Sequence, residues 1–437
     1  MPKLDHATTA LAPTFAEAFQ TWLKIGLLSF GGPTGQIALM HRIVVDEKKW
    51  LSEDRFLNAL NFCMLLPGPE AMQLATYAGW RLHGLKGGLA AGLLFVLPGA
   101  FVVLALSMIY AAFGNVPLID ALFLGVKAAV LVIVVEALLR VSKRALKTRA
   151  HWIMAALAFI AIFFFKAPFP LIVLIAAVVG YVMAMSSPVP AKATPLPAVP
   201  LAQTATTIGV WLAIWILPLL GIAAAFGHGH VLSQMAWFFS KLAVVTFGGA
   251  YTVLAYMGQD VVESHKWLST GQMMDGLGLA ETTPGPLILV TEFVGYLAAY
   301  KHGDGNPVVM GILGASVAVW ATFAPCFLWI FAGAPYIEWL NSQPKLKGAL
   351  AGITAAVVGV ILNLAVWFAL HVFFSNQVQA MSWGPLTVTV PTLSGLDWKV
   401  VALAIISGIA LLRLHMNIIY VLGLVSALAV AAWLAGL

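Results

Sequence analysis

This sequence is poor in charge and in cysteine. Asp, Glu, Lys and Arg together make up only 9% of its 437 residues, whereas 61% are hydrophobic and the mean hydropathy is +0.96. Such a composition excludes a soluble globular domain and predicts a membrane-embedded chain. The two cysteines, Cys63 and Cys326, lie in apolar runs, so we expect neither a disulfide framework nor a thiolate metal site.

Signals for processing and for catalysis are also missing. The N-terminal stretch MPKLDHATTALAP has no short apolar core followed by a cleavage site, so we expect no removable signal peptide. No Walker A pattern, HExxH motif or nucleophile elbow occurs. We therefore expect no enzyme, no cofactor and no bound metal, and we keep a membrane-embedded enzyme only as the alternative from a different class.

Long runs without any charged residue are present, for example 87–119 and 348–396. Each is long enough to cross a bilayer, where the backbone must be helical. The sequence thus predicts an all-α polytopic membrane protein. Apolar runs and breakers give about thirteen transmembrane segments, at 15–40, 55–80, 86–113, 118–140, 150–165, 168–185, 206–226, 233–257, 272–300, 307–333, 346–374, 398–413 and 416–436.

The chain contains an internal repeat. When the sequence is shifted by 217 residues, 24–69 aligns without a gap on 241–286, and 16 of the 46 positions are identical. Many matches fall on Gly, Pro, Trp and Lys, which chance apolar similarity does not explain. The predicted organisation is an N-terminal repeat at 1–185, a Pro-rich linker with a connecting helix at 186–231, and a C-terminal repeat at 232–437.

Lysine and arginine are distributed unequally between the repeats. Loops 41–55, 81–86 and 140–149 hold four, two and five of them, and the matching second-half loops hold one, one and none. By the positive-inside rule, the two six-helix repeats have opposite orientations. Some segments are expected to be broken or re-entrant instead of full crossings.

Two glycine- and proline-rich motifs interrupt apolar runs in each repeat. Inverted repeats with interrupted helices are typical of secondary transporters that bind substrate near the membrane midplane. Each motif should end one half-helix and begin another, so that freed N–H groups and the positive helix end bind an anion. Close helix packing or a simple kink is the alternative. The candidate substrate-binding residues are Gly31, Gly32, Pro33, Gly248, Gly249, Pro67, Gly68, Pro69, Pro284, Gly285 and Pro286.

A few charged residues lie near these motifs. Lys24 and Lys241 occupy equivalent positions seven residues before the glycine pairs and are candidates for attracting the anion, with snorkelling to the headgroups as the alternative. Glu70 and Glu281 flank the Pro-Gly-Pro motifs and are candidates for coupling or gating, with simple ion pairing as the alternative. Lys127, Glu136 and Glu292 are secondary candidates. The basic run 140–149 is interpreted as an orientation signal with lipid contact and no nucleic-acid binding.

The motifs carry a resemblance to a known family. The duplicated Phe-Gly-Gly and Pro-Gly-Pro motifs, the KWLS loops, YAGWRLHG, FVGY and the Pro-rich linker resemble the two-domain form of the chromate ion transporter (CHR) family over about 15–436. The resemblance implies export of chromate across the inner (cytoplasmic) membrane, chromate resistance, and sulfate as a structural analogue. The second repeat has Ala250 in place of Pro33, so the two breaks need not be equivalent.

Energetics agrees with export of a tetrahedral dianion. Moving two negative charges out of a negative-inside cell gains roughly 4.6 kcal/mol at 100 mV, on the order of a thousandfold gradient, so proton coupling is optional. A sulfate or other oxyanion transporter and an anion channel are the alternatives. Chromate, sulfate and lipids are the predicted partners, and a homodimer is left open.

Overall fold

The computed structural model of this chain describes residues 13–114, 116–185, 199–247, 249–374, 378–384 and 386–436. The first half contains helices α1 (Phe15–Leu28), α2 (Gly32–His41), η1 (Arg42–Glu47, π-helical), α3 (Glu53–Cys63), α4 (Glu70–Phe113), α5 (Pro117–Ala145), α6 (Arg149–Phe165) and α7 (Phe169–Met185). Helix α8 (Leu201–Phe226) follows the predicted linker, of which 186–198 lie outside the described residues.

The second half contains more elements than the first, because short helical turns and a β-hairpin lie between its longer helices. It contains α9 (Val231–Val245), α10 (Ala250–Gln259), η2 (Asp260–Ser264, π-helical), α11 (Thr270–Thr282), η3 (Leu287–Leu289), α12 (Val290–His302), α13 (Pro307–Gly333), η4 (Ala334–Tyr336), α14 (Ile337–Asn341), α15 (Pro344–Phe373), β1 (Val378–Trp383), β2 (Leu386–Pro391), η5 (Leu393–Gly395), α16 (Trp398–Gly408), η6 (Ile409–Arg413, π-helical) and α17 (Ile418–Leu434). The number of thirteen crossings, their opposite orientation and the domain boundaries stay predictions.

The described chain is helical and strongly apolar, as the composition predicts. Five of its helical stretches are long and apolar enough to cross a membrane, and four shorter helices are also apolar. Local signals set several helix starts: Ser269 and Gln272 form a reciprocal capping box at α11, and Asn306 caps α13 before Pro307. The described departure from an all-α chain is the antiparallel hairpin of β1 and β2 in the connection between α15 and α16.

One predicted boundary differs from the structure. The segments expected at 55–80 and 86–113 are joined, because helical residues run from Glu70 to Phe113 as α4. The run bends sharply at His83 and Gly84, where the backbone leaves helical geometry. Its two arms then pack together so closely that a Cβ on Gly79 would lie 2.3 Å from the Gly87 carbonyl oxygen. The bend therefore provides the expected turn without a loop.

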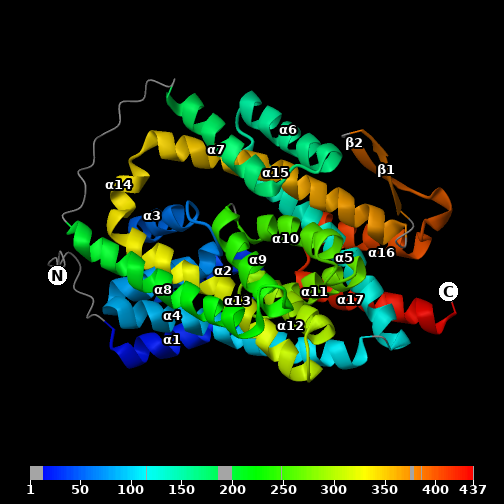
Figure 1. Ribbon diagram of the computed structural model, residues 1–437, viewed down its shortest axis with the longest axis horizontal. Helices are drawn as coiled ribbons and strands as arrows, with labels where there is room; N and C mark the ends of the chain where they lie inside the picture. Colours follow the sequence, from blue (N-terminus) through cyan, green and yellow to red (C-terminus); the bar gives the residue numbers. More distant parts are fainter. Residues whose placement is uncertain are drawn as a thin grey trace.

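Helices of each half pack against helices of the other half. Helix α15 packs against α6 and α7 of the first half, and α5 packs against α16 and α17 of the second half. Small residues allow the closest approach, since a Cβ on Gly180 would lie 2.2 Å from the Gly348 carbonyl oxygen. Helices α6 and α7 lie along one edge of the molecule beside α15, while α1, α4 and α8 lie toward the opposite edge (Figure 1). Helices α2, α9, α10 and α11, which adjoin the breaks, lie between these edges (Figure 1).

Candidate functional site

All four predicted interruptions break a helix. Helix α1 ends at Leu28 and α2 begins at Gly32, and α9 ends at Val245 and α10 begins at Ala250. The Pro-Gly-Pro motifs likewise separate α3 from α4 and α11 from η3. The prediction that each motif ends one half-helix and begins another is confirmed.

The breaks of the two halves are bonded to each other. The Gly68 N–H donates to the Thr246 carbonyl oxygen at 3.0 Å, and the Gly285 N–H donates to the Ser29 carbonyl oxygen at 2.9 Å. Ser29 and Thr246 are equivalent positions of the repeat, and so are Gly68 and Gly285. Each Phe-Gly-Gly break is therefore held by the Pro-Gly-Pro loop of the other half.

Positive backbone angles explain the choice of glycine at these breaks. The angle φ is 82° at Gly31, 67° at Gly32, 106° at Gly68, 96° at Gly249 and 92° at Gly285. Side chains other than hydrogen rarely tolerate such angles, so glycine lets the chain turn between half-helices without strain. Gly248, also a candidate, lies outside the described residues.

Three of the four breaks border one cavity of about 140 Å³, which we call the break cavity. The space is several times the roughly 30 Å³ that a water molecule takes in the liquid, so it is large enough for a small tetrahedral oxyanion. Its walls come from the first Phe-Gly-Gly break, the first Pro-Gly-Pro loop, the second Phe-Gly-Gly break, and helices α5 and α15. The lining residues are Pro33, Thr34, Cys63, Met64, Leu66, Gly68, Glu70, Ala137, Arg140, Val141, Arg144, Gly249, Ala250, Tyr251 and Thr354.

Two arginines of α5 give this cavity a cationic wall. Arg140 donates from Nη1 to Thr34 Oγ1 at 3.2 Å and from Nη2 to Glu136 Oε1 at 2.5 Å. Arg144 Nη2 lies 2.8 Å from Met64 Sδ. The sequence predicts only orientation and lipid contact for both arginines. One sequence signal could have indicated their place in the site: the two arginines are four residues apart on an apolar helix, so both lie on the same face.

Glu70 is the acidic residue of the break cavity. It begins α4 directly after the first Pro-Gly-Pro motif, and a Cβ added to Gly249 would lie 3.3 Å from its Oε1 and 3.5 Å from its Oε2. The carboxyl group of one half therefore lies against the glycine break of the other. The structure thus brings Pro33, Gly68, Glu70 and Gly249 together.

A second cavity of about 370 Å³ lies next to the first, and we call it the adjacent cavity. It is lined by Phe30, Gly31, Gly35, Glu136, Glu281, Leu411, His415, Met416, Asn417, Ile418 and Ile419. Two polar pairs connect the cavities, because Arg140 and Tyr251 line the break cavity while their partners line the adjacent one. One pair is Arg140 with Glu136, and in the other the Tyr251 hydroxyl donates to Glu281 Oε1 at 3.0 Å.

Glu281 is the more deeply buried partner in these pairs. Glu281 is only 5% exposed, and its Oε2 has no hydrogen-bond partner among the described residues. A buried carboxyl oxygen without a partner is costly, and such groups mark functional sites in membranes. Glu281 is thus placed at the contact between the cavities and not inside the break cavity.

Other predicted residues lie outside the break cavity. Lys24 is exposed on α1, and the Lys241 ammonium lies over the rings of Tyr256 and Phe238, at 5.3 and 5.9 Å from their centroids. Neither lysine lines the break cavity.

The Pro-Gly-Pro prolines act mainly through their backbone. Pro67 accepts a hydrogen bond from Gln73 Nε2 at 2.7 Å, and Pro69 precedes the first residue of α4. The second motif, Pro284 to Pro286, packs against Gly99 of α4, and Gly285 accepts from Gln36 Nε2 at 2.6 Å.

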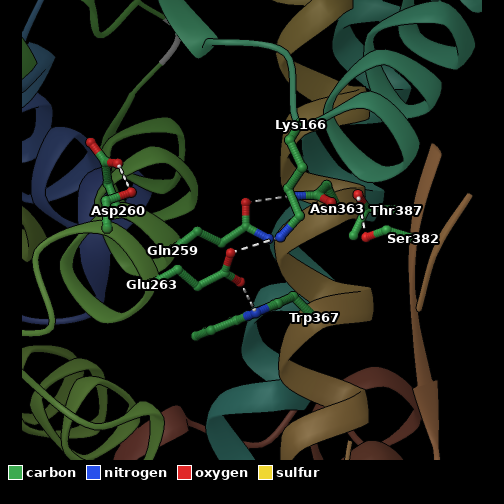
Figure 2. Close-up of polar contacts among 9 residues, drawn as sticks. Lys166, Gln259, Asp260, Glu263, Asn363, Trp367, Ser382 and Thr387 are labelled. Atoms are coloured by element: carbon green, nitrogen blue, oxygen red, sulfur yellow. Dashed lines mark hydrogen bonds and ion pairs between the residues drawn. The ribbon is translucent and has the colours of Figure 1, made fainter. Parts of the chain in front are cut away.

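A polar network that sequence reasoning missed joins α10 and η2 to α15 and to the turn between α6 and α7 (Figure 2). Lys166 Nζ lies 2.8 Å from Glu263 Oε2, and Trp367 Nε1 donates to Glu263 Oε1 at 2.9 Å. Asn363 Nδ2 also donates to Gln259 Oε1 at 3.0 Å. The network ties the half-helix that follows the second Phe-Gly-Gly break to both halves of the molecule.

Comparisons with known proteins agree with a membrane transporter. A family model described as "Chromate transporter" matches residues 16–181 and 233–432. The chain is 34% identical over 365 residues to "Chromate transport protein" of Pseudomonas aeruginosa, covering 82% of this chain and 83% of that protein. It is 29% identical over 381 residues to "Chromate transport protein" of Cupriavidus metallidurans, covering 83% and 84%. No solved structure gives a significant match.

Proposed function

We propose that this chain, which belongs to the chromate transporter family, is a secondary transporter that exports chromate across the cytoplasmic membrane and so confers chromate resistance. The names of the relatives support chromate as the substrate. The observation that carries the proposal is the break cavity, where three helix breaks and two arginines surround a space suited to a tetrahedral oxyanion.

The proposed binding site uses backbone groups at the breaks together with nearby charge. Glycine-rich breaks at half-helix starts offer N–H groups and a positive dipole end to an anion without a charged side chain. Gly249 of the second break lines the break cavity and can supply such an N–H group, Pro33 lines it without a donor, and Gly31 lines the adjacent cavity. The Pro-Gly-Pro loops hold these breaks in place through the reciprocal bonds to the opposite half. Lys24 and Lys241 act farther out by attracting the anion toward the site.

Export follows from the charge of the substrate. Chromate is a dianion, and its movement out of a negative-inside cell gains roughly 4.6 kcal/mol at 100 mV. That free energy supports a gradient on the order of a thousandfold without any coupled ion. The membrane potential is therefore a sufficient energy source.

The two acidic candidates have different proposed roles. Glu70 lies inside the break cavity, where its negative charge repels a dianion, so a proton on Glu70 and the dianion bind cooperatively. A proton carried in this way reduces the exported charge from two to one. Glu281 is bonded to Tyr251 at the contact between the two cavities, which suits gating of the passage.

Transport is proposed to proceed by alternating access. The inverted repeats would exchange conformations around the cavity, with the reciprocal bonds between the breaks as the pivot. The network of Figure 2 would hold one arrangement closed, since it fixes the half-helix α10 and η2 to α15 and to the turn between α6 and α7.

Uptake into inverted membrane vesicles tests the function. In such vesicles export appears as uptake, which should be saturable and should increase with an interior-positive potential. Excess sulfate should inhibit if it shares the site. Flux that does not saturate would favour an anion channel, and sulfate flux without chromate flux would favour a sulfate transporter. No flux despite normal insertion would overturn the proposed function.

A further inference from the structure

The two guanidinium groups of the break cavity differ in their partners. Arg140 is bonded to Glu136 and to Thr34, which follows the first glycine pair. Arg144, one helical turn farther along α5, contacts the sulfur of Met64, and no carboxylate of the described chain lies within 4.0 Å of it. Arg144 thus has no ion pair in the described chain, although the Glu70 carboxyl group lines the same cavity, so its charge is fully available to an anion when Glu70 carries a proton.

The charges around the cavity match a doubly negative ligand. Arg140 and Arg144 contribute two positive charges, Glu136 lies behind Arg140 on the side of the adjacent cavity, and the remaining acidic lining residue, Glu70, is neutral when it carries the proton proposed above. Guanidinium groups form paired, directional hydrogen bonds with oxyanions, and these are among the stronger hydrogen bonds in proteins. A tetrahedral dianion has enough oxygens to bond to both arginines at once.

We propose that Arg140 and Arg144 together form the dianion-binding subsite, and that the substrate displaces Glu136 from Arg140 when it binds. In the empty transporter, Glu136 is the counter-ion of Arg140. In the loaded transporter, the dianion takes that place and also neutralises Arg144. This inference rests on the proposed function and names the side chains that recognise its substrate class.

The subsite predicts selectivity by charge. A dianion bonds to both arginines, whereas a tetrahedral monoanion such as perchlorate compensates only one positive charge. Because Arg140 also bonds to Thr34, its release from Glu136 would change a contact at the first glycine break and so link binding to the moving part of the site. Loss of Glu136 removes the competitor and should favour the loaded form.

Initial rates of chromate uptake by inverted vesicles give the test, with sulfate and perchlorate as inhibitors. Arg140→Gln and Arg144→Gln should each raise the KM for chromate by about tenfold or more. Both should weaken inhibition by sulfate more than inhibition by perchlorate. Glu136→Gln should lower the KM for chromate by about fivefold, a change that a merely structural defect would not produce.

Lys143→Gln is the matched control. Lys143 is exposed on the same helix, carries the same charge and does not line the break cavity, so its loss affects the orientation signal equally and should leave the KM unchanged. If a glutamine variant fails to insert, Arg140→Lys and Arg144→Lys keep the charge but lose the planar fork. These two should still raise the KM several-fold.

The outcomes separate this proposal from the proposed function. If the wild type transports chromate and the arginine variants, including the lysine forms, keep its KM and its preference for sulfate over perchlorate as inhibitor, the subsite is refuted and the transporter function stands. An equal rise in KM in Lys143→Gln would refute it as well. Absence of chromate flux in the wild type would instead refute the proposed function.

Discussion

A single methyl group added at Gly249 should show whether transport depends on the geometry of the second Phe-Gly-Gly break or only on the general stability of the protein. The Gly249 backbone has φ of 96° and ψ of 178°, a region that is essentially restricted to glycine and costs other residues about 1–3 kcal/mol. A Cβ there would also lie 3.3 Å from Glu70 Oε1 across the break cavity. Relief of this strain requires the break to move, which changes the cavity.

Gly249→Ala should therefore reduce chromate transport strongly. A strain of about 1–3 kcal/mol lowers the population of the native break by roughly 5- to 150-fold relative to a relaxed alternative. The measurement is the initial rate of chromate uptake by inverted vesicles, divided by the amount of inserted protein. Retention of the wild-type rate would show that the geometry of this break does not govern transport.

Gly227→Ala is the matched control for strain. Gly227 has nearly the same backbone angles, φ of 82° and ψ of 158°, but it is exposed between α8 and α9, and an added Cβ would meet nothing within 4 Å. This variant should lose similar thermal stability while its transport rate stays within about twofold of wild type. Equal loss of transport in both variants would attribute the effect to instability.

Three further perturbations follow from the geometry. Gly99→Ala should destabilise the detergent-solubilised protein by about 1–3 kcal/mol in thermal unfolding, because the added Cβ would overlap the second Pro-Gly-Pro loop. Gly209→Ala on α8 is the control and should not destabilise it, since its Cβ would meet nothing within 4 Å. Equal unfolding temperatures of the two variants would contradict this. Tyr251→Phe and Glu281→Gln should each alter the transport rate, and the double variant should resemble either single one, whereas additive effects would indicate independent roles. Lys24→Gln should raise the KM at low ionic strength but not at 1 M salt, and a rise that persists in salt would place this lysine at the site.

Much of the scaffold was predictable from the sequence because a repeated pattern is hard to produce by chance. The breaks at Gly31 and Gly249 and the Pro-Gly-Pro interruptions were located from helix-breaking residues in matching positions, and all four interrupt helices. The bend of α4 at Gly84 was predicted as a loop, since sequence cannot tell a sharp change of backbone angle within a helical run from a connection outside it.

The side chains of the site were harder to predict. Arg140 and Arg144 belong to a basic run whose composition alone indicates orientation, and only the packing of α5 beside the breaks turns these two toward the cavity. Lys24 was favoured by its position seven residues before the glycine pair, yet it lies exposed on α1 and does not line the break cavity. Separation along the sequence did not show which way its side chain faces.

The central claim is that the membrane potential drives chromate export, and the number of charges that move with each chromate ion tests it most directly. Purified protein in proteoliposomes would be held at defined potentials while current and labelled chromate flux are recorded together. The account predicts outward movement of net negative charge with every chromate ion, two charges if the dianion moves alone and one if Glu70 carries a proton with it. Chromate flux that carries no current and does not respond to the potential would contradict the account.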